Sequence, residues 1–422
     1  MKTLMLFTLL FALILSPAFA GHETRSHPEN DLLARPAVTV TVGRSDADIV
    51  GSDNRALQAA VDYVGNLGGG VVQIGPGEYV MHDSVHMRSR VTVRGAGHAT
   101  VLKKAASVRS LLAADGDYGE DAVTLADAKG FEIGHGIHVA SKRAGGFHTI
   151  CATILNKDGN YLTLSRSLNA DCMMADEAYA AAVFPVISAY EVTNCRIENL
   201  DIDGNRGKNE FINGCRGAGI FCYRADGAVF ENCIVREYNG DGISFQQSND
   251  VQVLKCVCER NAGKGLHPGS GSQRPVIREC RSAYNDDDGF FFCWRVRNGL
   301  VENNEFIENG AYGVSIGHKD SDNLVQKNHI ARNKKGGVLW RDEKEPMAGH
   351  NIRFLDNTVE DNQGCGLFVS GQTNGTIIRG NVIRDTGKGA QKTGIRIGPD
   401  AGDVTIEDNS ITAGEQVVHD RK

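Results

Sequence analysis

Residues able to carry out acid–base or binding chemistry recur between positions 224 and 342 at intervals close to 24 residues. Asp241, Lys264 and Asp288 form one such series, and His267 lies three residues after Lys264. Carboxylates and histidines transfer protons, lysine and arginine pair with acidic groups, and aromatic rings stack on sugars. This combination suggests the chemistry of an acidic glycan.

The candidate residues fall into two groups. The candidates for proton transfer or charge stabilisation are His267, His318, Lys319, Arg341, Asp241 and Asp288. The candidates for substrate binding are Trp294, Arg295, Phe291, Gln246, Gln247, Arg224 and Asp342. The 11 cysteines include no Cys-x-x-Cys spacing, so the sequence indicates no metal site among them, and their odd number leaves at least one thiol unpaired.

A repeat of 23 or 24 residues must position these side chains. A glycine followed by an apolar residue recurs at positions 242, 265, 289 and 313. Two further columns keep the same phase and end in runs of asparagine: Cys195, Cys233, Cys256, Cys280, Asn304, Asn328, Asn357, Asn381 and Asn409, and Asn261, Asn285, Asn309, Asn333 and Asn362. Such a period predicts a solenoid, in which asparagines adopt the left-handed turn conformation and stack their amides along the axis.

The apolar pattern within one repeat identifies the type of solenoid. Leu300-Val301, Phe306-Ile307 and Val314–Ile316 are three apolar groups, each too short for a helix, which favours three short strands per turn. The repeat therefore resembles the pectin-lyase-like, right-handed parallel β-helix superfamily over residues 51–413. The expected fold is all-β: a single-stranded right-handed parallel β-helix with an N-terminal capping helix and a small inserted β subdomain.

The start of the solenoid carries its own pattern. Ala56, Leu57, Ala60, Val61 and Val64 form one helical stripe, which predicts an amphipathic helix that covers the open end of the coils. The opening from Asp53 through Gly75-Pro76-Gly77 is similar to that of pectate-lyase and rhamnogalacturonase-like proteins. This resemblance supports the fold and assigns no catalytic residue.

The chain divides into six predicted segments. Residues 1–20 read as a secretory signal peptide, with an apolar run and a small-x-small site at Ala18 and Ala20, and imply a secreted or periplasmic protein. Residues 21–50 form a polar lead with a candidate first strand at Thr39–Val42, and residues 51–105 the capping helix and first coils. Residues 106–190 break the repeat and are expected to form the inserted subdomain, residues 191–413 the coils, and residues 414–422 a tail.

Alternation of side chains along a strand predicts which residues face outward. The residue two after each anchor glycine points away from the core and stacks about 4.8 Å from its equivalent in the next coil. This outward column comprises Phe221, Ser244, His267, Phe291, Ser315, Leu339, Phe368 and Arg396. We expect His267, Trp294, His318, Lys319, Arg341 and Asp342 to converge on one groove, bordered by Asp241 and Asp288.

Several activities are compatible with this groove. In a hydrolase, Asp241 and Asp288 would lie about 10 Å apart, near the upper limit for an inverting pair. In a polysaccharide lyase, a histidine would remove the proton beside a uronate carboxyl while a cation such as Lys264 neutralises it. A C5-epimerase would share that first step, and a non-catalytic glycan-binding or surface scaffold would need the aromatic and basic residues alone.

Two local motifs leave the reaction open. Asn285–Asp288 and Gly313–Gly317 resemble parts of the polygalacturonase pattern, but Tyr312 stands where that family has histidine and no Arg-Ile-Lys follows. Those catalytic roles therefore do not transfer. The run Asp286-Asp287-Asp288 offers carboxylates to a calcium ion, although an acidic turn explains it better, and no other cofactor is expected.

Charge and hydropathy limit the partners. The formal net charge of −7 argues against nucleic acid, and an acidic polysaccharide or oligosaccharide is the expected partner because a local basic strip can persist on an acidic protein. The apolar run from Leu4 to Leu15 is too short to span a bilayer, so no membrane span is expected after signal cleavage. The oligomeric state stays open.

Overall fold

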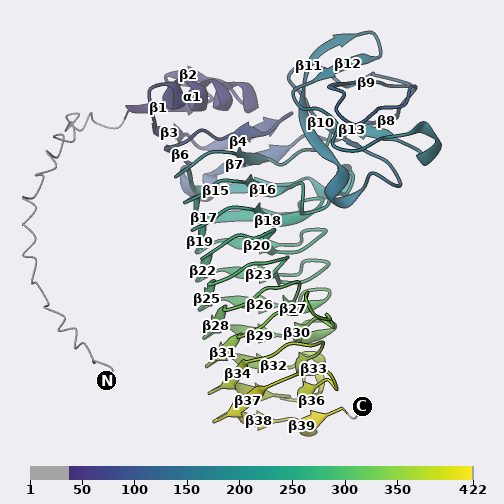
Figure 1. Cartoon of the computed structure of the whole chain (residues 1–422). Coiled ribbons are helices and arrows are strands. Elements are labelled where there is room, and N and C mark those ends of the chain that lie inside the picture. The colour runs from purple at the N-terminus through teal and green to yellow at the C-terminus, as the bar shows by residue number, and fades with distance from the viewer. Residues whose placement is uncertain (1–37, 421–422) are drawn as a thin grey trace, which may run out of the picture. The chain divides into compact units, whose positions relative to one another are not determined.

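The computed structural model describes residues 38–420, which form a stack of parallel coils with one inserted antiparallel sheet (Figure 1). The predicted signal peptide and most of the predicted lead lie outside the described residues. No helix in the described part of the chain is long and apolar enough to cross a membrane.

Each coil contributes strands to three columns that run the length of the stack. The first column contains β1 (Val38–Gly43), β2 (Ile49–Val50), β3 (Gly70–Ile74), β6 (Val91–Arg94), β15 (Arg196–Asp203), β17 (Val229–Arg236), β19 (Gln252–Leu254), β22 (Val276–Arg278), β25 (Leu300–Glu302), β28 (Leu324–Gln326), β31 (Arg353–Leu355), β34 (Thr376–Arg379) and β37 (Val404–Glu407). The second column begins with β4 (Gly77–Met81) and β7 (Thr100–Lys104), takes in the second halves of β15 and β17, and continues with β20 (Val257–Glu259), β23 (Arg281–Ala283), β26 (Glu305–Ile307), β29 (His329–Ala331), β32 (Thr358–Glu360), β35 (Val382–Arg384) and β38 (Ser410–Thr412).

The third column is an 11-stranded parallel sheet, and the candidate residues lie on its strands or in the turns beside them. Its strands are β5 (Val85–His86), β14 (Ile187–Tyr190), β16 (Ala218–Tyr223), β18 (Asp241–Gln246), β21 (Leu266–Gly269), β24 (Phe290–Phe291), β27 (Tyr312–Ile316), β30 (Gly336–Trp340), β33 (Gln363–Val369), β36 (Ala390–Ile397) and β39 (Glu415–His419). The predicted parallel β-helix is confirmed. Apolar side chains from all three columns fill one continuous core inside the coils.

A helix covers the N-terminal end of this core. Helix α1 (Asn54–Asn66) starts at Asp53, whose carboxylate accepts the backbone N–H of Arg55 at 3.0 Å, and it packs against β1, β3 and β5. It buries Leu57, Ala60, Val61 and Val64, which are four members of the predicted stripe. Three-residue 3-10 turns occur elsewhere at η1 (Gly97–Ala99), η2 (Gly146–His148), η3 (Met174–Asp176) and η4 (Arg206–Lys208).

The break in the repeat is an inserted sheet with its own core. Its six antiparallel strands are β8 (Arg109–Leu111), β9 (Ala122–Thr124), β10 (Gly136–Ala140), β11 (Ile150–Asp158), β12 (Tyr161–Leu164) and β13 (Tyr179–Ala181). A separate apolar cluster that includes Phe131 and Ile154 fills it. We refer to residues 109–181 as the insertion.

Three predicted boundaries need correction. The first coil begins at Val38, because β1 pairs in parallel with β3. The insertion ends before residue 190, because Ile187–Tyr190 pairs with β5 and β16 in the third column. The predicted tail at 414–422 contains β39, which pairs with β36 as a further coil strand.

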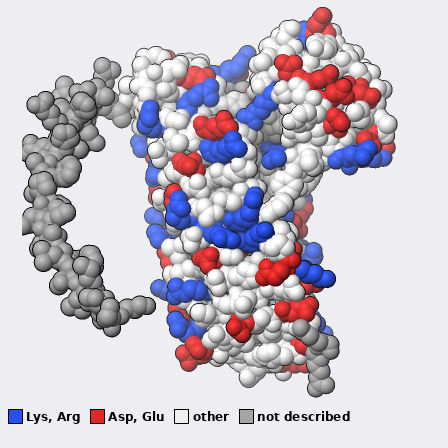
Figure 2. Space-filling view, in the orientation of Figure 1, with Lys and Arg blue, Asp and Glu red and all other residues white. Residues whose placement is uncertain are grey.

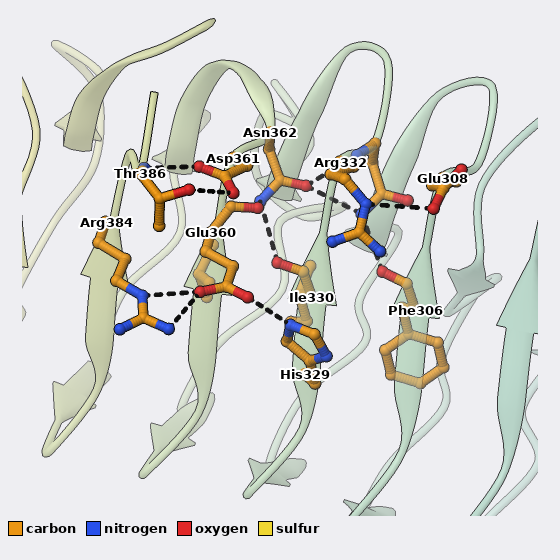
Figure 3. Close-up of polar contacts among 12 residues, drawn as sticks. Phe306, Glu308, His329, Ile330, Arg332, Glu360, Asp361, Asn362, Arg384 and Thr386 are labelled. Atoms are coloured by element: carbon orange, nitrogen blue, oxygen red, sulfur yellow. Dashed lines mark hydrogen bonds and ion pairs between the residues drawn. The ribbon is translucent and has the colours of Figure 1, made fainter. Parts of the chain in front are cut away.

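Buried amides connect successive coils at two corners. Asn309 illustrates the pattern: its Nδ2 donates to the Ser282 carbonyl at 3.1 Å and to Asn333 Oδ1 at 3.0 Å, while its Oδ1 accepts Nδ2 of Asn285 at 3.0 Å. Asn362 continues this ladder with a bond to the Ile330 carbonyl at 3.0 Å (Figure 3). The stacking of the predicted asparagine columns is therefore confirmed.

Two details of the asparagine columns are corrected. The left-handed residue is the one before each ladder asparagine, such as Asn303 with φ 57° and Glu308 with φ 57°. Cys195 does not belong to the first asparagine column, because the residue that pairs with Cys233 in the preceding coil is Leu200. The sequence spacing predicted the wrong residue because residues 206–216, which we call the excursion, lengthen that coil.

Several charged side chains on the coil surface pair across neighbouring coils. On the face seen in Figure 2, basic and acidic side chains are interspersed along the stack. Arg278 pairs with Glu302 at 2.6 Å, and Glu360 contacts both His329, at 2.9 Å, and Arg384 (Figure 3). Such partly exposed pairs each stabilise the fold by about 1 kcal/mol or less.

We predict that Asn309→Ala destabilises the protein by about 3 kcal/mol or more, because it leaves buried partners on both neighbouring coils without hydrogen bonds. Equilibrium denaturation would measure this loss. Lys334→Ala, at an exposed position next to the same ladder, is the matched control and should change the free energy of unfolding by about 0.5 kcal/mol or less. Equal effects for the two variants would contradict a stabilising role for the ladder.

Candidate functional site

The outward column has the register that the spacing predicts. Phe221 pairs with Ser244, Ser244 pairs with His267, and Phe291 pairs with Ser315. Ser315, Leu339, Phe368 and Arg396 continue the same line. The neighbours of these residues in the sequence, such as Leu266 and Phe290, point into the core. The column therefore faces away from the interior of the coils.

The outward face is not uniformly exposed, which corrects the expectation for His267. Its side chain is only 3% exposed, because the excursion lies over it. Ser244 Oγ donates to the Gly214 carbonyl at 2.6 Å, which ties the excursion to the column. A Cβ on Gly214 would lie 1.7 Å from Asp241 Oδ2, so glycine at this position allows the close approach.

Under the excursion is a cavity of about 420 Å³ that we call the His267 cavity. It brings together five predicted site residues, namely Asp241, His267, Phe291, Trp294 and His318. Its other lining residues are Phe147 from the insertion, Phe211, Asn213, Gly214 and Cys215 from the excursion, and Ala262, Gly263, Lys264, Asp287, Cys293 and Met347 from the coils.

A hydrogen-bonded acid–base pair lies at the base of this cavity. Asp241 Oδ2 is 2.6 Å from His267 Nδ1, and Asp241 Oδ1 accepts the backbone N–H of Lys264 at 2.8 Å. Burial and these bonds act in opposite directions on Asp241, and its pKa is lowered overall. Burial also opposes a charge on His267, but the adjacent Cys293 sulfur and Asp241 raise the pKa of His267 to about 9. His267 Nε2 is buried and has no hydrogen-bond partner.

A cation and two aromatic rings form the wall of the His267 cavity. Lys264 Nζ bonds Asp287 at 2.5 Å, and although burial opposes its charge, Asp241 and Asp287 raise the pKa of Lys264 above its ordinary value. Phe291 lies edge-on to the His267 ring at 5.3 Å between centroids. Lys264 Nζ lies 4.6 Å from the centre of the Phe291 ring, and Trp294, which is 37% exposed, adds an accessible indole to the wall.

Residues of the next two coils lie against this wall. Arg341 lies over the Phe291 ring at 4.4 Å and donates to Ser315 Oγ at 2.9 Å and to the Phe292 carbonyl at 2.8 Å. His318 Nε2 lies 2.8 Å from Glu343, and burial and Arg341 lower the pKa of His318. Arg341 therefore holds the aromatic wall in place and does not line the cavity.

Other predicted residues lie away from the cavity lining. Lys319 is partly buried in the turn after β27 and Asp342 is exposed after β30, while Gln246 is buried with its amide bonded to Ser244 Oγ at 3.0 Å. Gln247 and Arg295 instead line a separate shallow depression. Arg224 is exposed and bonds Gln247 and Glu191. These residues do not converge with His267.

The acidic run at 286–288 does not form one site. Asp286 pairs with Arg206, Asp287 pairs with Lys264, and Asp288 accepts the backbone N–H of Tyr312 at 2.9 Å. The three carboxylates thus have separate partners, and the arrangement offers no shared position for calcium. Asp288 and Asp241 do occupy equivalent positions two coils apart, as predicted, because each bonds the backbone of the following coil.

A second cavity adjoins the first on the same face. The Tyr190 cavity, of about 390 Å³, is lined by Thr149, Ile150, Cys151, Arg166, Ser167, Asn169, Tyr190, Glu191, Arg216, Phe221 and Tyr223. The Arg166 guanidinium lies 3.4 Å from the centre of the Tyr190 ring. Arg216 donates to the Phe147 carbonyl at 2.7 Å, so neighbouring residues of the insertion and excursion separate the two cavities.

Sequence reasoning missed the residues that the insertion and excursion bring to the site. Phe147, Phe211 and Cys215 belong to no repeat, so no periodic signal places them. Cys293 follows the outward column by two residues, but its closeness to Cys215 depends on how the excursion folds back. The sequence did indicate Lys264, because it occupies the same position in its repeat as Asp241 and Asp288 do in theirs.

The stacked coils define a parallel β-helix protein with a partly covered cavity on one face, lined by both apolar and polar side chains. A family model described as "Right handed beta helix region" matches residues 185–351 and 345–419. The chain belongs to this family, which confirms the predicted superfamily and the right-handed coil. No curated protein matches the sequence.

Solved structures with the same fold have low sequence identity to this chain. The A-module of Azotobacter vinelandii mannuronan C-5 epimerase AlgE4 superposes with a TM-score of 0.57 and 18% identity, covering 90% of this chain and 100% of that one. An endo-xylogalacturonan hydrolase from Aspergillus tubingensis gives 0.55 and 12%, covering 90% and 95%. The Dettilon tailspike protein gives 0.58 and 10%, covering 90% and 68%. These similarities establish the fold alone.

We predict that Asp288→Asn becomes more stable relative to the wild type as pH rises from 4 to 7. Burial and the charge of Asp287 raise the pKa of Asp288 to about 6, from an unperturbed 3.8. Because the folded-state pKa is the higher one, the stabilising contribution of the protonated carboxyl is complete below pH 3.8 and is lost as pH rises through about 6.

In Asp288→Asn the amide oxygen still accepts the Tyr312 N–H, and the side chain does not titrate. The free energy of unfolding therefore differs from that of the wild type by at most about 3 kcal/mol at pH 7 for this reason. Denaturation of both proteins across the pH range measures it. Asp342→Asn, at an exposed position, is the control and should show the wild-type pH dependence. A constant difference between Asp288→Asn and the wild type would refute the assignment.

Proposed function

We propose that the protein is an exported enzyme that acts on an acidic, uronate-containing polysaccharide bound along the outward column. The observation that carries this proposal is the pairing of aromatic rings with cations in two adjoining cavities. Phe291 and Trp294 accompany Lys264 in the His267 cavity, and Tyr190 accompanies Arg166 in the Tyr190 cavity. Aromatic faces stack on sugar rings while the cations pair with carboxylates.

The spacing of the two cavities suits an oligosaccharide. Phe221 lines one cavity and Phe291 the other, and they are separated by three coil steps of about 4.8 Å, or about 15 Å in all. A chain of a few sugar units covers this length. The names of two of the similar structures, a mannuronan C-5 epimerase and an endo-xylogalacturonan hydrolase, agree with this substrate class.

Proton abstraction fits the site better than hydrolysis. A hydrolase needs two carboxyl groups free to face the glycosidic bond. Asp241 has both oxygens engaged, by His267 and by the Lys264 backbone, and Asp288 is not among the residues that line the cavity. A lyase or epimerase needs a cation beside the sugar carboxylate, and Lys264, which lines the cavity and pairs with Asp287, is proposed to supply it.

The corresponding reaction begins at the carbon next to the carboxylate. A base removes the proton from C5, and the electron pair moves toward the carboxylate while Lys264 balances its charge. In a lyase the pair then expels the sugar oxygen at C4 and leaves a double bond. In a C5-epimerase a proton returns to C5 from the opposite face. His267 lines the cavity, and the reacting carbon is proposed to bind beside it.

A non-catalytic glycan-binding scaffold is the alternative that the accessible Trp294 also supports. It would bind the same polymers and leave them chemically unchanged. Product analysis separates the two proposals, because only an enzyme generates a new uronide, a new chain end or an altered residue.

Export rests on the apolar run Leu4–Leu15 and the small residues Ala18 and Ala20. Mass spectrometry of the protein from the producing cell is expected to give Gly21 as the first residue. Retention of Met1 in the mature protein would contradict cleavage and export.

The activity test uses the purified full chain and a panel that includes polymannuronate, polygalacturonate and a neutral glucan. We predict turnover of an acidic polymer, detected as ultraviolet absorbance of an unsaturated uronide for a lyase or as changed residue composition by NMR for an epimerase. Lys264→Ala should lower kcat/KM by about 100-fold or more, because it removes the charge that offsets the carboxylate. Trp294→Ala should mainly raise KM, by about 5- to 50-fold.

The matched control is Tyr284→Ala, which removes an exposed aromatic ring outside both cavities and should keep wild-type kinetics. New reducing ends without an unsaturated product would instead indicate hydrolysis. Binding of an acidic polymer with no product would establish the scaffold. If no acidic polymer bound, the proposed substrate class would be wrong.

A further inference from the structure

Three metal-ligating side chains meet at the base of the His267 cavity. Cys215 comes from the excursion, His267 from β21, and Cys293 follows β24. One nitrogen of His267 and the two cysteine Sγ atoms all lie within 4.8 Å of one another. All three residues are buried, with exposed fractions of 6%, 3% and 7%. Residues from three distant parts of the chain thus converge on one point.

The state of the imidazole points to a missing ligand. His267 Nδ1 is held by Asp241 at 2.6 Å, whereas Nε2 is buried without any hydrogen-bond partner. Buried polar atoms are seldom left unpaired, because they lose their hydrogen bonds to water and gain nothing in return. Thiols are weak hydrogen-bond partners, so the two neighbouring cysteines do not compensate Nε2 well.

The donor set selects a particular kind of metal ion. Two thiolates and one imidazole suit zinc, whereas calcium and magnesium require oxygen ligands. Zn–S bonds of about 2.3 Å and Zn–N bonds of about 2.0 Å place tetrahedral ligand atoms about 3.5–3.8 Å apart. Atoms that already lie within 4.8 Å need to move by only about 1 Å to reach this geometry.

Surrounding groups orient the imidazole as metal sites commonly do. A carboxylate on the second nitrogen of a ligating histidine fixes its tautomer and strengthens it as a ligand. Asp241 occupies that position, and the Lys264 backbone N–H in turn holds Asp241 Oδ1 at 2.8 Å. The Ser244–Gly214 hydrogen bond fixes the excursion beside Cys215. The cluster is therefore held in place before any ion arrives.

We propose that Cys215, His267 and Cys293 bind a zinc ion through two Sγ atoms and Nε2, with its fourth position open to the His267 cavity. Three protein ligands and one open position are typical of a catalytic zinc site. All three ligands line the cavity that also contains Lys264 and Trp294, so the open position faces the proposed substrate. This inference extends the proposed function, since the metal supplies a second positive charge beside a sugar carboxylate, but metal binding itself does not depend on that function.

The test begins with the full chain, reduced and freed of metal by a chelator. Zinc is titrated against a chromophoric chelator, and cobalt is added in a parallel experiment. We expect one zinc per chain and, with cobalt, intense visible bands and a thiolate charge-transfer band typical of a tetrahedral site with sulfur ligands. Cys215→Ala, His267→Ala and Cys293→Ala should each weaken zinc binding by about 100-fold or more.

Two further variants separate ligation from general structural effects. Asp241→Asn should retain one zinc per chain but bind it about 10- to 100-fold more weakly, as expected for the partner of a ligating histidine. Cys172→Ala removes another buried cysteine, located in the insertion, and should bind zinc like the wild type. Circular dichroism on all variants verifies that they are folded, and wild-type binding by a folded Cys293→Ala variant would refute the site.

The competing state is a disulfide between Cys215 and Cys293. Peptide mapping after thiol alkylation, without reductant, detects it. A Cys215–Cys293 disulfide together with failure of the reduced protein to bind zinc would overturn the proposal. If the protein bound zinc but acted on no acidic polymer, the metal site would be supported and only the proposed function would be refuted.

Discussion

The stacking of buried amides between coils is the constraint on which the rest of the structure depends. Each ladder asparagine bonds a backbone carbonyl of the previous coil and the amide of the next, as Asn304 does with the Ile277 carbonyl and Asn328. An amide displaced by one residue would lose both partners in the interior, where water cannot replace them. The ladders therefore fix the register of the coils, and with it the alignment of the outward column.

That constraint explains why much of the fold could be predicted from the sequence. A period of 23 or 24 residues identifies equivalent positions directly, so the pairing of Ser244 with His267 and of Phe291 with Ser315 follows from spacing. The prediction fails where the period is interrupted. Cys195 was misaligned because the excursion lengthens its coil, and the left-handed residue precedes each ladder asparagine because backbone bonds to the next coil impose that conformation on residues such as Glu308.

The candidate site was less predictable for a physical reason. Periodicity shows which side chains are neighbours along the axis, but it says nothing about what a non-repeating segment lays over them. The excursion buries His267 and delivers Cys215, and the insertion delivers Phe147. Arg341 was predicted to line the groove and does not. It has the expected position in its repeat, but its guanidinium contacts Ser315, the Phe292 carbonyl and the Phe291 ring. The repeat thus supplies the platform, while non-repeating segments complete the cavity.

A crystal structure of the full chain with a bound oligouronate would show whether an acidic glycan binds along the outward column. We expect a sugar ring against Phe291 and Trp294, a carboxylate within hydrogen-bond distance of Lys264 Nζ, and the glycan chain extending toward Arg166 and Tyr190. An oligouronate bound elsewhere on the coils, with both cavities unoccupied, would contradict the account.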